Sequence, residues 1–407
     1  MPQTKETQIG ESPQLASARA KYRQYMQDIR HLLFSTPHIH KSQRVREQAE
    51  FYLEQVKAVA FNLGIAPQQD YPRFHVDTLF GPCIYTIWGP NPDFIYAWVW
   101  VDGAKSYRIR GNRNDTVWGS FQVTSGFWGD PDAKNLSEVP FEDLDIDAEG
   151  SFEITVSAKP QKGNWLPLNA DSENNYIFHR RTVVDWENER VAGAHIELLD
   201  DTRRPIHMDE AKLACRIEWA GKTMKNATAL YTIGLIQRAL DHAGTNKFFC
   251  VNGDEFKDSG YNPGAKYFHA VYDLSETEAL IIETEPADAK YWGVHLTDIW
   301  LQSIDFVHHQ SSLNAAQTKI SSDGKIRIVL SLIDPGVENW LDPAGCGYGL
   351  IQFRSYYGTV VPPMATRVVA LSELRGHLPA DTATITERTR NEVLRRRARS
   401  ILKHYGV

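Results

Sequence analysis

Gly150-Ser-Phe-Glu-Ile-Thr-Val156 followed by Asn164-Trp165-Leu166 recurs later in the chain as Gly324-Lys-Ile-Arg-Ile-Val329 followed by Asn339-Trp340-Leu341. A Trp-Gly pair precedes each copy, 47 residues before Trp165 (from 118) and 48 before Trp340 (from 292), and a strand ending in an arginine, at 180 or 354, follows each. Agreement at several offsets indicates two related structural units. Differences between the copies can therefore locate function.

Short aromatic and β-branched runs separated by turn residues predict β-strands in both copies. In residues 151–158, apolar and polar side chains alternate, as expected of a strand with one buried and one wet face, and residues 325–332 are its match. Two further strands are predicted at residues 84–88 and 94–101. Helices do not alternate with strands inside either copy. The sequence therefore predicts a mainly β fold of two related antiparallel β-sandwich or jelly-roll units, not a parallel α/β architecture.

Helical patterns flank these units, at residues 12–66, at residues 209–243 and from Thr384 to Tyr405. Thr384 and Glu387 form a candidate capping box. The last helix is basic with an apolar stripe, so we expect it to pack against the body or a second subunit. The predicted parts are an N-terminal helical region (1–78), a first repeat (79–190), a helical linker (191–264), a second repeat (265–360) and a C-terminal helical tail (361–407).

Composition narrows the class of protein. The 407 residues carry a net charge of −7, which gives no electrostatic reason to expect a nucleic-acid partner. The N-terminal segment has no apolar stretch, so neither a signal peptide nor a membrane span is expected. The four dispersed cysteines contain no C-x-x-C, and a reduced cytoplasmic setting is the default expectation. Motifs for nucleotide binding and for the common serine and zinc hydrolases are absent from the sequence.

Four motifs carry a resemblance to a known family: Gly89-Pro-Asn-Pro-Asp93, Tyr107-Arg-Ile-Arg-Gly111, Ser312-Leu-Asn314 and Asp334-Pro-Gly-Val-Glu-Asn-Trp-Leu-Asp342. Together they resemble the bacterial domain of unknown function 1214 family, which is often found beside domain of unknown function 1254. The resemblance covers about residues 80–357. It implies β-sandwich or jelly-roll domains, and it implies no settled chemistry from which catalytic residues could be carried over.

Polar residues specific to the second copy make it the candidate site. Alignment of the copies on their Trp-Gly pairs sets Phe121 against His295. After His295 the second copy holds carboxylates, histidines and amides, whereas the first copy holds Ser125, Phe127, Trp128 and an acidic loop. A carboxylate beside an imidazole can move protons at neutral pH. We therefore predict catalytic roles for Asp305, His308, His309 and His295. The alternative remains open that the histidines lie in a solvated loop, that Asp305 caps a turn and that His295 is a satisfied strand histidine.

Other side chains of this region could form apolar walls and orient a substrate oxygen. An arginine could hold an anionic group, or equally satisfy a buried carboxylate. The residues predicted to bind substrate are Trp300, Gln302, Phe306, Asn314, Gln317, Arg108, Asp342 and Arg354.

The function expected from these residues is that of a metal-independent acid/base enzyme, a hydrolase, lyase or isomerase, acting on a small apolar or glycosidic molecule in a Trp-rich cavity. One alternative is a non-catalytic small-molecule or carbohydrate binding module. A second is a metal-dependent jelly-roll enzyme with histidine and aspartate ligands. No cofactor is expected. The expected partner is a small-molecule substrate, and a homo-oligomer through the terminal helices is a further alternative.

Overall fold

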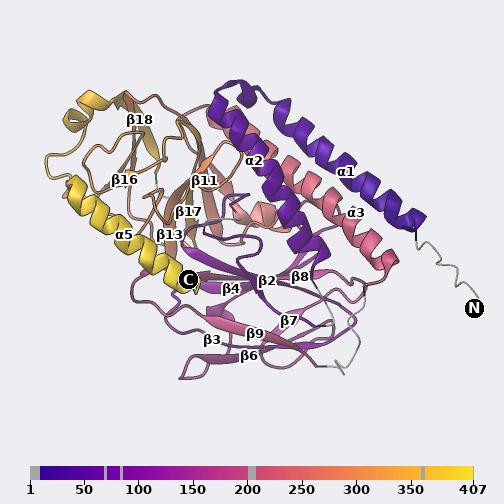
Figure 1. Cartoon of the computed structure of the whole chain (residues 1–407). Helices are drawn as coiled ribbons and strands as arrows, with labels where there is room; N and C mark the ends of the chain where they lie inside the picture. The colour runs from indigo at the N-terminus through magenta and orange to yellow at the C-terminus, as the bar shows by residue number, and fades with distance from the viewer. Residues whose placement is uncertain (1–9, 68–70, 83–85, 200–207, 359–362, 407) are drawn as a thin grey trace, which may run out of the picture.

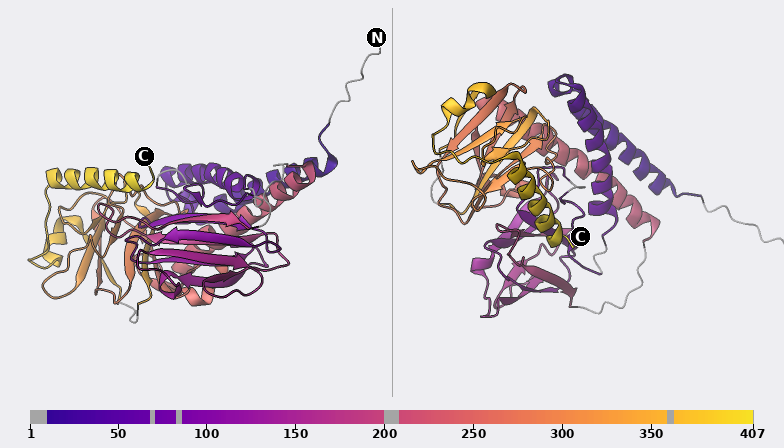
Figure 2. Two further views of the ribbon diagram at one scale, coloured as in Figure 1. Left: turned by 90° about the horizontal axis from the view of Figure 1, so that it is seen from below. Right: turned by 60° about the vertical axis from the view of Figure 1, so that its left-hand side comes forward.

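The computed structural model describes residues 10–67, 71–82, 86–199, 208–358 and 363–406. Two β-sandwich units lie side by side, with a helical layer along one side of them (Figures 1 and 2). The prediction of a mainly β fold built from two related units with added helices is confirmed.

The first unit packs a five-stranded sheet against a four-stranded one. Its core is the apolar face of the alternating strands, including Phe121, Phe152 and Ile154. The five-stranded sheet has the order β1 (His75–Val76), β2 (Phe94–Val101), β8 (Asn175–Thr182), β4 (Gly119–Ser125), β5 (Lys134–Pro140). The four-stranded sheet has the order β7 (Trp165–Pro167), β6 (Ser151–Ser157), β3 (Tyr107–Asn112), β9 (Gly193–Leu198).

The second unit repeats this topology strand for strand. Its five-stranded sheet has the order β10 (Phe249–Asn252), β11 (Ala265–Asp273), β17 (Tyr348–Tyr356), β13 (Tyr291–Asp298), β14 (Ser312–Asn314). Its four-stranded sheet has the order β16 (Trp340–Leu341), β15 (Ile326–Ser331), β12 (Glu278–Thr284), β18 (Ala365–Ala370). Neighbouring strands are antiparallel in both units except for the parallel pairs β6–β7 and β15–β16.

The Asn-Trp-Leu signature is a structural motif in both units. Asn164 Nδ2 donates to the carbonyl oxygens of residues 145 and 153, and Asn339 Nδ2 donates to those of residues 319 and 327. Trp165 Nε1 donates to Ser157 O at 3.1 Å, and Trp340 Nε1 donates to Ser331 O at 3.0 Å. The duplicated Asn-Trp-Leu sequence therefore fixes the short parallel strand, β7 or β16, to its sandwich by the same hydrogen bonds in both units.

Helices cover the junction of the units. α1 (Pro13–Phe34) packs against α3 (Glu210–Ala227), and α2 (Gln43–Ala60) lies beside them (Figure 1). α5 (Glu387–His404) packs against residues of both units, among them Ile95 and Phe306. Its N-cap is Thr386, which accepts from Thr389 N, so the predicted capping box at Thr384 is wrong. The remaining helical segments are η1 (Pro37–His40), η2 (Phe61–Ile65), η3 (Phe141–Asp143), η4 (Thr228–Ile233), α4 (Gly234–Ala243), η5 (Gly253–Ser259) and η6 (Leu371–His377).

Strand pairing sets the limits of the units and differs from the predicted boundaries. β9 pairs with β3, so the first unit continues beyond residue 190. β10 pairs with β11 and β18 pairs with β12, so the second unit begins before residue 265 and continues beyond residue 360. These outer strands are short or polar, which is why their pattern did not predict them.

The strand registers show which residues of the two units correspond. Arg180 on β8 lies opposite Tyr96 on β2, and Arg354 on β17 lies opposite Tyr267 on β11. The arginines that end the two repeats are therefore equivalent, as their spacing predicts, and each has a tyrosine beside it.

The same registers correct the predicted alignment on β4 and β13 by one residue. Ser120 and Gly293 are the residues paired with the two equivalent arginines, so the counterpart of His295 is Gln122 and not Phe121. Because side chains alternate between the faces of a sheet, a slip of one residue exchanges the faces. Phe121 lies in the core of the first sandwich, whereas His295 shares the opposite face of its sheet with Gln352.

Candidate functional site

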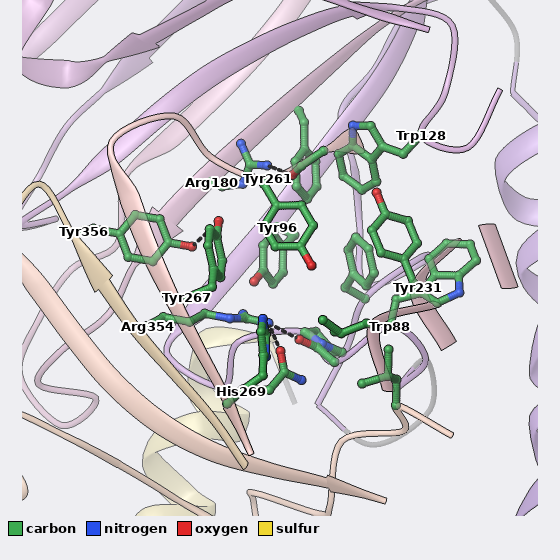
Figure 3. A pocket seen from close by; sticks show the side chains of 18 residues that line it. Trp88, Tyr96, Trp128, Arg180, Tyr231, Tyr261, Tyr267, His269, Arg354 and Tyr356 are labelled. Atoms are coloured by element: carbon green, nitrogen blue, oxygen red, sulfur yellow. Dashed lines mark hydrogen bonds between the residues drawn. The ribbon is translucent and has the colours of Figure 1, made fainter. Parts of the chain in front are cut away.

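A cavity of about 90 Å³ lies where the two five-stranded sheets meet, beside η4 and α4 (Figure 3). This is several times the roughly 10–15 Å³ of cavity that one water molecule needs, so a small organic molecule fits. Concave, mostly aromatic walls with a few polar groups are typical of small-molecule sites. The lining side chains include Phe80, Trp88, Tyr96, Trp128, Phe178, Arg180, Tyr231, Leu235, Tyr261, Tyr267, His269, Leu301, Gln352, Arg354 and Tyr356.

The two equivalent arginines tie the units together by reciprocal hydrogen bonds. Arg180 Nη2 donates to Gly260 O of the second unit at 3.0 Å, and Arg354 Nη2 donates to Gly89 O of the first unit at 2.6 Å. Each glycine begins a Gly-x-Asn-Pro turn, at residues 89–92 and 260–263. The two units are therefore related by an approximate twofold axis at the cavity, and both contribute residues to its walls.

The electrostatic surroundings of the two arginines differ. Arg180 Nη1 lies 3.5 Å from Glu138 Oε2, and both side chains are 5% exposed. Glu138 is on β5, and Ser312 takes its place on β14. In the part of the chain that the structure describes, no carboxylate oxygen lies within 4.0 Å of the Arg354 guanidinium, although Arg354 is only 8% exposed. A buried charge without a partner is costly, so Arg354 is the main electrostatic feature of the cavity.

Polar side chains surround Arg354 in the second unit. His269 and Gln352 are register partners on β11 and β17. Among the described residues, no hydrogen-bond partner is found for either ring nitrogen of His269, for Gln352 Nε2 or for Arg354 Nε. In the first unit the same two places carry aromatic side chains, Trp98 and Phe178. The cavity thus has a donor-rich side and an aromatic side, and Figure 3 shows Arg354 and His269 across from Trp128 and Tyr231.

Burial keeps His269 and the tyrosines Tyr96, Tyr261 and Tyr356 uncharged at neutral pH. Desolvation, aided by the charge of Arg354, lowers the pKa of His269 to about 3. Desolvation raises the pKa of Tyr261 to about 12, and it also raises the pKa of Tyr96 and of Tyr356. The hydroxyls therefore stay protonated and the imidazole stays neutral, so none of them offsets the positive charge of Arg354.

Unusual backbone conformations cluster at the cavity. Trp88 and Leu301 have φ values of 65° and 60°, in the left-handed region that such residues rarely adopt, and Gly89 N donates to Leu301 O at 2.8 Å. Tyr231 comes from η4, a π-helix, which is also a rare conformation. The predicted strand at residues 84–88 is not formed at 86–88, where the chain turns; residues 84 and 85 lie outside the described residues.

A second depression, of about 290 Å³, lies beside α2. Its wall includes Gln302, Asp305 and His309, which were predicted from sequence, together with Asp298, Phe51 and Arg44. Gln302 Nε2 donates to Asp298 Oδ2 at 2.7 Å and to Gln48 O at 3.1 Å, so its amide is engaged in structural contacts.

Two Asp–His pairs lie at this depression. Asp305 Oδ2 is 2.8 Å from His308 Nδ1, and Asp342 Oδ2 is 2.7 Å from His309 Nδ1. Asp305 Oδ1 also accepts from Val307 N and His308 N, as in a capped turn. Burial acts to raise the pKa of Asp305, but the hydrogen bonds from His308 and Val307 outweigh it and hold that pKa below its ordinary value. The pairing of His309 with Asp342 was not predicted from sequence, and both pairs lie outside the aromatic cavity.

The other predicted residues occupy separate places. Trp300 is fully buried and its Nε1 donates to Val45 O of α2 at 2.7 Å. Phe306 is buried against α5. Asn314 Nδ2 donates to Val184 O, and Gln317 Oε1 accepts from the backbone N of Asn314, so both fix a turn.

Two further predicted residues, Arg108 and His295, lie on strands of different sheets. Arg108 lies on β3 in an ion-pair ladder with Glu153 and Glu197, on the sheet face away from the cavity. His295 is buried on β13, and desolvation holds its pKa well below the ordinary value. Of the residues predicted to bind substrate, Arg354 alone is among those that line the central cavity.

Sequence reasoning missed the aromatic wall and the polar pair His269 and Gln352. A signal was present, because Gly89-Pro-Asn-Pro and Gly260-Tyr-Asn-Pro are each followed by a tyrosine seven residues after the glycine, at 96 and 267. This second duplicated motif marks the segments that meet at the cavity.

No three histidine, cysteine, aspartate or glutamate side chains gather as a metal-ligand set within the described ranges. The alternative of a metal-dependent enzyme stays a prediction, and the described residues offer no group of three such ligands for it. None of the described helices combines the length and apolar character that crossing a bilayer requires.

Comparison with known proteins supports the fold. Residues 99–181 match the family described as "Protein of unknown function (DUF1214)", which confirms the resemblance for that segment. The chain is similar to the crystal structure of an uncharacterized protein from Burkholderia cenocepacia, with a TM-score of 0.81 and 26% identity over 88% of this chain and 99% of that one. The VPA0106 protein from Vibrio parahaemolyticus matches with a TM-score of 0.44 and 12% identity over 88% and 100%. No curated protein matches the chain.

Proposed function

We propose that this protein binds a small molecule with an apolar or aromatic body in the cavity between its two units. The observation that carries this proposal is a half-open cavity whose aromatic lining comes from both units and from η4. The left-handed conformations of Trp88 and Leu301 support it, because strained backbone concentrates at functional sites. This is the binding alternative of the sequence analysis, in a different place from the residues that suggested catalysis.

Filling the cavity should abolish binding. Leu235 is 3% exposed and reaches the cavity from α4, so Leu235→Phe places added volume in the void. We expect benzamide, a small neutral aromatic probe, to raise the melting temperature of the original protein and to quench the fluorescence of Trp88 and Trp128. The Leu235→Phe variant should show neither effect and should lose less than about 1 kcal/mol of stability, since the void accepts the ring.

The matched control is Leu330→Phe, a fully buried site in the core of the second sandwich. Overpacking there should cost about 1–3 kcal/mol and leave the response to benzamide unchanged. Equal binding by the original protein and the Leu235→Phe variant would place the probe elsewhere and remove the proposal.

The second candidate function is acid/base catalysis at the surface depression, as a hydrolase, lyase or isomerase. The adjacent pairs Asp305–His308 and Asp342–His309 favour it, because each places a carboxylate on an imidazole nitrogen. No nucleotide or metal is required by this chemistry.

Asp305→Asn tests this candidate. Its amide oxygen can still accept from Val307 N, so folding should be preserved, whereas loss of the carboxylate should lower turnover by about 100-fold or more. The measurement is hydrolysis of nitrophenyl esters and glycosides at pH 7, with unfolding curves for both proteins. A turnover unchanged by the substitution excludes the role.

A further inference from the structure

We propose that the ligand of the central cavity is a small carboxylate, and that its anionic group is held by Arg354 while its apolar body lies against the aromatic side. This inference rests on the proposed function and specifies the class of its ligand. It follows from differences between two units that share one fold.

Comparison of the two arginines identifies the missing charge. Arg180 has Glu138 as its carboxylate partner, at 3.5 Å. Arg354 occupies the equivalent place in the second unit, where Ser312 replaces the glutamate. Water does not take the place of the missing carboxylate, because Ser312 is 1% exposed and Arg354 is 8% exposed. The unit that lacks the carboxylate thus retains the buried cation, and a ligand carboxylate would supply the counter-charge.

Arg238 adds to the positive charge, and the buried tyrosines and His269 carry no counter-charge at neutral pH. The positive charges of Arg354 and Arg238 both lower the pKa of His269. Because burial raises the pKa of Tyr96 and of Tyr356, these hydroxyls are not anions at neutral pH. With Arg180 matched by Glu138, the centre of the molecule keeps a surplus of guanidinium charge.

Free donors surround the same point. Arg354 uses Nη2 for Gly89 O and Gln352 Oε1, which leaves Nε without an acceptor among the described residues. Gln352 Nε2 also has no acceptor in this part of the chain, and neither ring nitrogen of the neutral His269, one of which carries a proton, has a hydrogen-bond partner there. Residues 352 and 354 lie two apart on β17 and therefore face the same side of the sheet. Two carboxylate oxygens could accept from Nε of Arg354 and Nε2 of Gln352 together.

The aromatic side selects the remainder of the ligand. Where the second unit has His269 and Gln352, the first has Trp98 and Phe178, and Phe178 lines the cavity with Phe80 and Trp128. A short apolar or aromatic carboxylate would present its charge to the second unit and its body to the first.

The test compares isosteric pairs, benzoate with benzamide and butyrate with butyramide, by calorimetric titration of the whole protein. We expect the carboxylates to bind about 10- to 100-fold more tightly, the range for hydrogen bonds to charged groups. Arg354→Gln should remove this preference while leaving amide binding within about threefold. Gln352→Met should reduce carboxylate binding by a smaller factor than Arg354→Gln does. It provides the test if Arg354→Gln does not fold.

The control removes a guanidinium outside the cavity, as Arg110→Gln on the exposed face of β3, and should keep both the affinities and the carboxylate preference. Amides that bind as tightly as carboxylates to the original protein would overturn this inference and leave the proposed function standing. A preference that survives Arg354→Gln would also overturn it. Binding of none of the four probes would contradict the proposed function itself.

Discussion

Replacing Arg180 with methionine is expected to lower the free energy of unfolding by about 3–5 kcal/mol at pH 8, the range for removing one partner of a buried ion pair. The substitution leaves Glu138 buried without its cation, and it removes the hydrogen bond to Gly260 O that joins the units. Chemical denaturation monitored by tryptophan fluorescence gives the value directly.

The loss should shrink as pH falls. Burial raises the pKa of Glu138, and the charge of Arg180 opposes that rise. Without Arg180, the pKa of Glu138 in the folded state rises further above its value in the unfolded state. The loss of stability is therefore absent at a pH where Glu138 is protonated in both states, and it grows as pH rises through the folded-state pKa. Denaturation of the variant at pH 5 and at pH 8 should show this difference.

Two controls isolate the orphaned charge. Adding Glu138→Gln to Arg180→Met should restore stability to within about 1–2 kcal/mol, because the amide oxygen can still accept from Asn262 Nδ2. Arg354→Met, at the equivalent place, should also cost only about 1–2 kcal/mol, since it orphans neutral acceptors and no carboxylate. Equal losses at the two arginines would show that the cavity is not electrostatically asymmetric.

The fold was predictable because its signals are local. Alternation in β6 and β15 and the offsets that lead to Trp165 and Trp340 each depend on one sandwich, and each sandwich repeats the same hydrogen bonds. The limits of the units were harder to predict, because the edge strands β9 and β18 are exposed and carry little apolar pattern.

The cavity was not predictable in the same way, because it forms only when two distant segments meet. Arg354 touches Gly89, 265 positions away in the chain. The sequence-based prediction relied on residues that are close in sequence. Asp305 does contact His308, three positions away, but the two lie in a surface turn. An alignment offset of one residue also concealed the relation of His295 to Gln122, which would have directed attention to the correct face of the sheet.

A buried carboxyl on β13 makes the stability of the whole protein dependent on pH. Asp298 is 1% exposed, and desolvation raises its pKa to about 7, against the opposing hydrogen bonds from Gln302 and Trp300 N. Within the described ranges no lysine, arginine or histidine nitrogen lies within 4.0 Å of this carboxylate. The folded protein therefore retains a proton that the unfolded chain releases near its ordinary pKa.

Stability attributable to Asp298 should fall as pH rises from about 4 to about 7 and stay constant above that, because the unfolded state binds fewer protons in this interval. The span corresponds to roughly 4 kcal/mol, at about 1.4 kcal/mol for each tenfold change in the proton equilibrium. Asp298→Asn cannot ionise, and its Oδ1 can still accept from Trp300 N and Gln302 N. Subtracting the unfolding free energies of the variant from those of the original protein at each pH isolates this contribution. A flat difference between pH 4 and pH 7 would mean that Asp298 is ionised in the fold, with its charge stabilised by the two backbone amides and the Gln302 side chain alone.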